Sequence, residues 1–76
     1  MKANGPAIRA LRERSGWSLT DLAREAAIDI THLSRMETGK RAGTPRQLCE
    51  IARILQVPVT VVATSGPEPE TEQVPA

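Results

Sequence analysis

The sequence predicts an all-α fold, a compact bundle of five helices. Aliphatic residues recur at helical spacing in successive segments, and capping residues or proline stand where the segments begin. Trp17 is the only aromatic residue, so the core must be aliphatic, a composition that suits small helical bundles. The 76 residues are close to the lower limit for a single hydrophobic core, so one domain is expected.

The first helix is expected to begin at Pro6, a favoured first helical position, after a short flexible arm of residues 1–5 that includes Lys2. Its inward face contains three residues at helical spacing: Ile8, Leu11 and Arg12. Gly16 supplies a left-handed stop. Trp17 is interpreted as an apolar residue that covers the last turn, and not as a ligand-stacking residue.

Two short amphipathic helices follow, and the chain is organised around them. Ser18 is a good N-cap for helix two, about residues 19–26, and Asp29 for helix three, about residues 30–38. Their apolar faces consist of Leu22, Ala23 and Ala26 in the first and Leu33 and Met36 in the second. Only residues 27–28 separate them, so the helices must cross steeply. This is the helix-turn-helix arrangement, whose second helix can enter a DNA major groove.

A glycine-bounded basic loop, residues 39–43, leads to the fourth helix, with Thr44 as N-cap and Pro45 at the first helical position. The buried stripe of this helix is Leu48, Ile51, Ala52 and Leu55. Cys49 flanks the stripe and is interpreted as a packed core thiol. It is the only cysteine, which excludes an intramolecular disulfide and a thiolate metal cluster.

Residues 59–64 allow two interpretations. Their β-branched run favours a strand, which could serve as a dimer edge, whereas Pro58 favours a short fifth helix that closes the bundle. We favour the helix. Residues 65–76 are rich in Pro and Glu without apolar periodicity, so we expect a disordered acidic tail after a domain of residues 1–64.

The charge is distributed unevenly. The net charge is only +1, but residues 1–66 carry all ten Lys and Arg with six acidic residues, a net +4, and the last ten residues carry −3. A basic domain suits nucleic acid, and the tail could bind a protein partner. One His, one Cys and no Tyr leave no catalytic pair or metal site, so neither an enzyme nor a cofactor is expected. No membrane-spanning or signal segment is recognisable, so we expect a cytoplasmic protein.

The chain resembles the lambdoid phage repressor and Cro-type helix-turn-helix family from about Ala7 to Ala63. The residues that carry the resemblance are Ile8, Leu11, Arg12, Gly16-Trp17-Ser18, Asp21-Leu22-Ala23, Leu33 to Glu37, Gly39-Lys40-Arg41, Leu48, Ile51-Ala52, Leu55 and Val57-Pro58. It implies a lambda-repressor-like fold and binding to double-stranded DNA. The family often joins the positions of Arg12 and Glu37 by a salt bridge, and either charge would be costly if buried alone. We therefore expect a structural Arg12–Glu37 pair.

One position departs from the family pattern. The family usually has Gln at the first residue of helix two, where it contacts a phosphate. Here that residue is Leu19, which cannot donate a hydrogen bond and can extend the core instead.

The outward face of helix three supplies the candidates for base contact. Since Leu33, Met36 and Glu37 face inward, Thr31 and Arg35 lie on the opposite face, one turn apart. Arg35 can bind guanine O6 and N7 with its two-pronged guanidinium, or it is a solvated or phosphate-binding arginine. Ile30 either meets a thymine methyl group or packs back onto the domain. His32 is either a groove-edge contact or an exposed bystander.

The loop after helix three and the start of helix four are expected to cross the phosphate backbone. The candidates for phosphate contact are Thr38, Lys40, Arg41, Thr44 and Arg46. Lys2 could add a contact from the arm. The other arginines, Arg9, Arg14, Arg24 and Arg53, are expected on solvated faces.

These observations together predict a sequence-specific regulator of transcription, a small Cro-like phage or bacterial repressor. It would bind an inverted-repeat operator as a homodimer through its third helix. The dimer surface is expected on helix five and the end of helix four, because Val59, Val61 and Val62 exceed what a short element needs for its own core. The alternative is an antitoxin or protein-interaction module on the same fold, with the tail as its binding segment.

Overall fold

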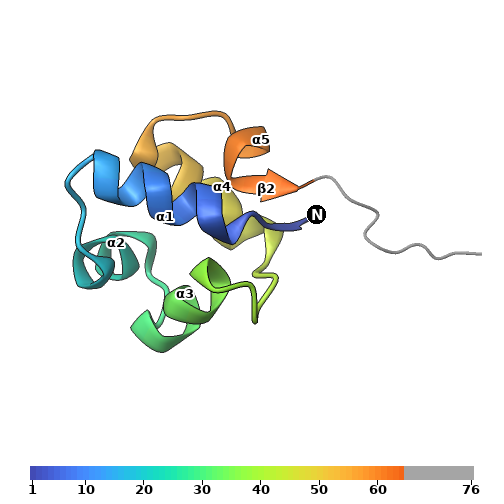
Figure 1. Cartoon of the computed structure of the whole chain (residues 1–76), viewed down its shortest axis with the longest axis horizontal. Helices are drawn as coiled ribbons and strands as arrows, with labels where there is room; N and C mark the ends of the chain where they lie inside the picture. Colours follow the sequence, from blue (N-terminus) through green and yellow to red (C-terminus); the bar gives the residue numbers. More distant parts are fainter. Residues whose placement is uncertain (65–76) are drawn as a thin grey trace, which may run out of the picture.

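Five helices and one pair of two-residue strands make up residues 1–64, the part of the chain that this computed structural model describes (Figure 1). The elements in chain order are β1 (Lys2–Ala3), α1 (Gly5–Arg14), α2 (Leu19–Ala26), α3 (Ile30–Glu37), α4 (Pro45–Leu55), α5 (Val59–Val62) and β2 (Ala63–Thr64). The expected bundle of five helices is confirmed. The disordered tail expected at residues 65–76 lies outside the described residues.

The core lies at the centre of the bundle, between the helices. In Figure 1, α2 and α3 lie below α1, and α5 lies above it. Helix α1 contacts α3, α4 and α5, while α2 contacts both α3 and α4. The largest fully buried side chains come from all five helices: Ile8, Leu22, Leu33, Met36, Leu48, Ile51 and Val62. The core is thus aliphatic, and Trp17 is half-buried against its edge.

Helix ends follow the capping chemistry that the sequence contains. The side chains of Asn4, Ser18, Asp29 and Thr44 each accept a hydrogen bond from a backbone N–H in the first turn of the helix that follows. Gly16, Ala27 and Gln56 adopt positive φ and end α1, α2 and α4. At each of these ends, the next residue donates its N–H to a carbonyl five residues back, which satisfies carbonyls that the helix leaves free.

The N-terminal segment corrects one expectation. Residues 1–5 are not a flexible arm: Lys2–Ala3 pairs antiparallel with Ala63–Thr64, and Gly5 already belongs to α1. Ala3 is buried, and its N–H donates to the carbonyl of Ala42 at 2.7 Å. Two residues are too few to show a strand pattern in a sequence. The strand that pairs with them also lies about 60 residues away.

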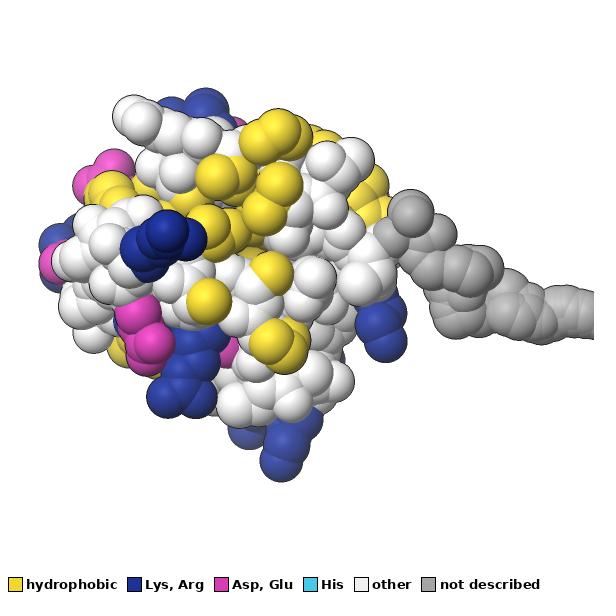
Figure 2. All heavy atoms as spheres, turned by 45° about the horizontal axis from the view of Figure 1, so that its top comes forward, with side chains coloured by type: hydrophobic (Ala, Val, Ile, Leu, Met, Phe, Trp, Pro, Cys, Tyr) yellow, Lys and Arg dark blue, Asp and Glu magenta, His cyan; other side chains and the backbone are white. Residues whose placement is uncertain are grey.

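Residues 59–64 combine both expected conformations. One helical turn, Val59–Val62, is followed directly by the strand Ala63–Thr64. Val62 is fully buried and Val59 packs partly against the core, whereas Val61 remains 38% exposed. Val59 and Val62 therefore pack within the domain. Of the three valines expected at the dimer surface, only Val61 remains exposed. Apolar side chains still gather on the face over α1 and α5 (Figure 2).

The expected packed core thiol at Cys49 is wrong. The buried residues of α4 are Leu48, Ile51, Ala52 and Leu55, and Cys49 is exposed. Each helical residue is rotated by about 100° from the one before it. Cys49 consequently points past the edge of the stripe into solvent.

Candidate nucleic-acid interface

The turn between α2 and α3 fixes how the second helix is presented. Ala27 adopts a left-handed conformation (φ 57°, ψ 43°), which costs an L-residue roughly 1–2 kcal/mol. Two backbone hydrogen bonds offset this cost, because Ala27 N–H donates to Arg24 O and Ile28 N–H to Ala23 O. Ile28 is buried, so the turn is held from inside. Asp29 then accepts hydrogen bonds from the N–H groups of Thr31 and His32 and starts α3.

Helix α3 turns one face inward and one outward. Leu33 and Met36 are fully buried, while Thr31 and Arg35 are exposed on the opposite side. Ile30 is 41% exposed, so its side chain does not pack back into the domain. The interpretation in which Ile30 packs back onto the domain is therefore not favoured, and its side chain faces outward. These three residues form a surface that can offer an apolar group, a hydroxyl and a guanidinium to a partner.

His32 has a more defined environment than either interpretation assumed. It is half-buried, and its Nε2 lies 3.2 Å from Oε1 of Gln47 on α4. The same Gln47 oxygen accepts a hydrogen bond from Thr44 N–H, so one amide ties α3 to the start of α4. His32 is not an exposed bystander. Because Nε2 faces Gln47, a contact between His32 and a base would have to use the other atoms of the imidazole ring. Gln47 was missed as a site residue, although the Thr44-x-x-Gln47 capping pattern was readable in the sequence.

The loop after α3 is held by the carbonyl groups at the end of that helix. The N–H groups of Lys40 and Arg41 both donate to Arg35 O, at 2.8 and 3.2 Å. The Thr38 hydroxyl donates to Ser34 O and Arg35 O, so it is already engaged within the helix. The side chains of Lys40 and Arg41 are exposed, as are Thr44 and Arg46 at the start of α4. The backbone is thus fixed while the cationic groups face solvent.

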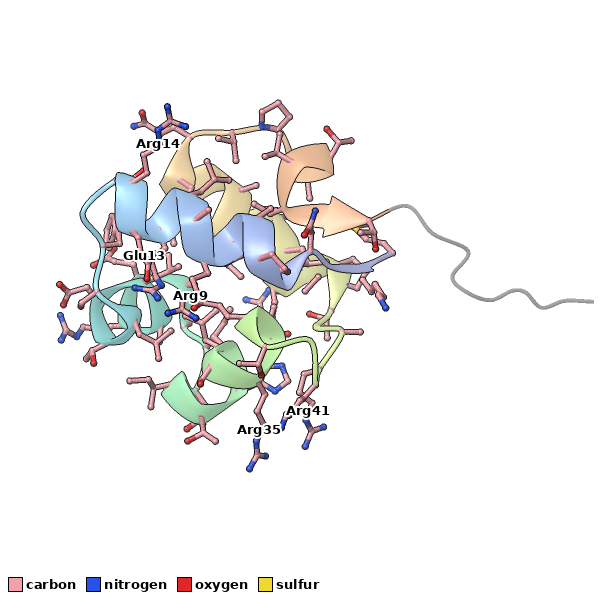
Figure 3. The ribbon with its side chains drawn as sticks, viewed as in Figure 1. Arg9, Glu13, Arg14, Arg35 and Arg41 are labelled. Carbon is pink, nitrogen blue, oxygen red and sulfur yellow. The ribbon has the colours of Figure 1, made fainter. Side chains whose placement is uncertain are left out.

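Ion pairing separates the ten cationic side chains into two groups. Four pair with an acidic residue: Arg9 with Glu13, Arg12 with Glu37, Arg24 with Asp21, and Arg53 with Glu50. Within residues 1–64, the six that form no ion pair are Lys2, Arg14, Arg35, Lys40, Arg41 and Arg46. Five of these six belong to β1, α3, the loop after it and the first turn of α4. Arg35 and Arg41 project from one side of the molecule, and Arg14 projects from the opposite side (Figure 3). Uncompensated positive charge is therefore concentrated around α3.

Arg12 and Glu37 form the expected pair. Arg12 Nε donates to Glu37 Oε2 at 2.7 Å and Nη2 donates to Oε1 at 3.0 Å, while Nη1 donates to Trp17 O. The side chains are only 12% and 6% exposed. The hydrogen bond with Glu37 raises the pKa of Arg12 above its ordinary value. The pair joins α1 to the inner face of α3, so it supports the outward face without being part of it.

The start of α2 provides no side-chain amide. Leu19 is half-buried and packs against the core, as expected from its apolar character. Ser18 caps the helix through Asp21 N–H, and the Asp21 carboxylate pairs with Arg24 at 3.3 Å. This end of the helix-turn-helix therefore has less capacity for a phosphate group than the loop after α3.

Other kinds of site receive no support from the described part of the chain. Among residues 1–64, no three His, Cys, Asp or Glu side chains lie close enough together to hold a metal ion. No helix in that range has the length and apolar character needed to cross a lipid bilayer.

Comparisons with known proteins agree with the helix-turn-helix arrangement of α2 and α3. Residues 5–64 match the family described as helix-turn-helix domain. The fold is similar to that of SinR, the master regulator for biofilm formation of Bacillus subtilis, in complex with DNA (TM-score 0.70, 28% identity, covering 75% of this chain and 95% of the SinR chain in that structure). It is also similar to the restriction-modification controller protein C.AhdI from Aeromonas hydrophila (0.70, 25%, 72% and 83%). A third similar structure is the clp gene regulator ClgR from Corynebacterium glutamicum (0.71, 27%, 74% and 60%). No curated protein matches the sequence.

Proposed function

The chain belongs to the helix-turn-helix family, and from this premise we propose that it is a sequence-specific, double-stranded DNA-binding regulator of transcription. In its most specific form it is a small Cro-like repressor of a phage or a bacterium, acting in the cytoplasm. The observation that carries the proposal is the concentration of unpaired cations around the exposed face of α3. The similarity to SinR, which was crystallised with DNA, supports the same assignment.

Helix α3 would lie in the major groove of the DNA, where its side chains would contact the edges of the bases. Arg35 is exposed and forms no ion pair within residues 1–64, so its guanidinium is available for guanine O6 and N7. Thr31 lies one turn earlier on the same face and can offer its hydroxyl or its methyl group. Ile30 is placed to meet a thymine methyl group, and His32 would contact the groove edge.

Register on the duplex would come from phosphate contacts. The contacting residues would be Thr38, Lys40, Arg41, Thr44 and Arg46, which follow α3. Thr38 would have to turn its hydroxyl from Ser34 O and Arg35 O to the phosphate. The backbone of the contacting residues is held by hydrogen bonds to the end of α3 and by the capping box of α4, so little conformational freedom is lost on binding. With Leu19 at the start of α2, the clamp on the opposite side is weaker than in the family pattern.

Two copies would bind an inverted repeat, with half-sites about one helical turn apart. The dimer seam would lie on the apolar face over α1 and α5 (Figure 2). Val61 of α5 is 38% exposed and would belong to it. Repression needs no cofactor in this scheme, because the bound dimer excludes RNA polymerase from the promoter. Control would then depend on the concentration of the protein or on a partner.

Selection from a random pool of duplex DNA at near-physiological salt tests this function. Enrichment of one inverted repeat is expected, and its spacing gives the separation of the two reading helices. Binding without enrichment would leave phosphate contact but refute sequence reading. Absence of binding would refute DNA binding altogether and favour a protein-interaction role.

A further inference from the structure

Strand β1 is fixed between two parts of the chain. On one side Lys2 pairs with Thr64 and Asn4 N–H donates to Val62 O at 2.9 Å. On the other side Ala3 N–H donates to Ala42 O at 2.7 Å, in the loop between α3 and α4. Successive residues of a strand point their N–H groups in opposite directions, so the strand can bond both neighbours at once. The position of Lys2 is therefore set relative to that loop.

Lys2 and the loop enclose a small hollow of about 140 Å³. Its lining residues are Lys2, Ala3, Gly39, Lys40, Arg41 and Ala42. Three of the six are cationic and none is acidic. Within the described range of the chain, none of the three cations forms an ion pair. Like charges brought together in this way repel one another, and an anion placed among them removes the repulsion.

We propose that Lys2, Lys40 and Arg41 together bind one backbone phosphate of the DNA duplex, with Lys2 held in place by strand β1. This inference rests on the proposed function and adds to it a phosphate contact from Lys2, in the N-terminal strand β1. Lys40 and Arg41 lie in the loop that directly follows α3. Lys2 reaches the same hollow only because β1 ties the N-terminal residues to Ala42.

The strand matters for the strength of the contact. A lysine on a flexible arm must lose the freedom of the arm's backbone when it binds a phosphate. In β1 that backbone is already paired, so only the lysine side chain is ordered on binding. Each cation that neutralises a phosphate also releases counterions, which makes binding more salt-dependent. Lys2 should therefore be visible in the salt dependence of affinity.

The test compares wild-type protein with Lys2→Ala and Arg14→Ala on a bound duplex between about 50 and 200 mM salt. Arg14 is a matched control, because it is exposed, forms no ion pair within residues 1–64 and projects from the side opposite Arg35 and Arg41 (Figure 3). One phosphate contributes about 0.9 to the slope of log K against log salt per bound chain, so Lys2→Ala should lower the slope by a part of that value, equally on specific and unrelated duplexes. Arg14→Ala should leave the slope unchanged, and Lys2→Arg should retain the wild-type slope.

The outcomes separate the site from the function. A slope for Lys2→Ala equal to that of wild type and Arg14→Ala, with DNA binding intact, would overturn the phosphate site alone. Equal losses in both variants would show a general effect of net charge and would also overturn it. Failure of the wild-type protein to bind duplex DNA would overturn the function and the site together.

Discussion

Replacing Arg12 by Met would leave the Glu37 carboxylate inside the domain without a cation. In the wild-type structure, Glu37 accepts two hydrogen bonds from Arg12, at 2.7 and 3.0 Å, and its side chain is only 6% exposed. No other Lys or Arg of residues 1–64 pairs with it. Removing one partner of a buried pair costs about 3–5 kcal/mol, and Arg12→Met should fall within that range.

The opposite substitution, Glu37→Leu, should cost less. Arg12 would keep its hydrogen bond to Trp17 O at 3.1 Å, and Glu13 lies 3.9 Å from its Nη2. We expect a loss near the lower end of the range, about 3 kcal/mol. Since a domain of this size is stable by roughly 3–10 kcal/mol, either variant should unfold at a much lower urea concentration than wild type. The double variant Arg12→Met/Glu37→Leu buries no charge and should be more stable than either single variant.

Urea unfolding followed by the fluorescence of Trp17, the only tryptophan, measures all four proteins. We expect the double variant to be more stable than Glu37→Leu, and Glu37→Leu to be more stable than Arg12→Met, because the isolated carboxylate keeps fewer partners than the isolated guanidinium. Losses below about 1 kcal/mol in both single variants would show that the pair behaves like an exposed one, and would refute the reasoning. A double variant less stable than both single variants would contradict it equally.

Three further predictions concern the interface and its support. Lys40→Ala should reduce the salt slope of DNA binding by up to about 0.9 per chain, measured by titration at several salt concentrations; an unchanged slope would remove Lys40 from the phosphate contacts. Leu19→Gln should tighten DNA binding by restoring an amide at the start of α2, while lowering stability by about 1 kcal/mol because Leu19 is half-buried; weaker binding would contradict this. Gly5→Ala should destabilise the domain by about 1–3 kcal/mol, because a Cβ there would lie 2.5 Å from the carbonyl oxygens of Met36 and Glu37; an unchanged unfolding midpoint would contradict it.

Local chemistry made much of the fold predictable. The N-caps at Ser18, Asp29 and Thr44 act within three residues of themselves, so the sequence alone contains the whole interaction. The aliphatic stripes likewise need only helical periodicity, and Leu33 and Met36 are buried as that periodicity requires. These signals are strong because cause and effect lie within one turn of helix.

Long-range contacts could not be predicted in the same way. Strand β1 exists because Lys2–Ala3 meets Ala63–Thr64, and no pattern in two residues announces a partner so distant. Gln47 reaches His32 only because α4 begins beside α3 in space. Cys49 was misplaced for another reason: cysteine is often buried, and this average outweighed the helical angle that puts it outside the stripe.

The central claim is that Arg35 on α3 reads a base, and parallel selections from one random duplex pool test it most directly. Wild-type protein, Arg35→Ala and the control Arg14→Ala would each be selected under the same salt conditions. Wild type and Arg14→Ala should enrich the same inverted repeat. Arg35→Ala should bind more weakly by about 1–3 kcal/mol and lose the preference at one position in each half-site. Enrichment of an unaltered repeat by Arg35→Ala would contradict the account, because the side chain would then contact only phosphate or solvent.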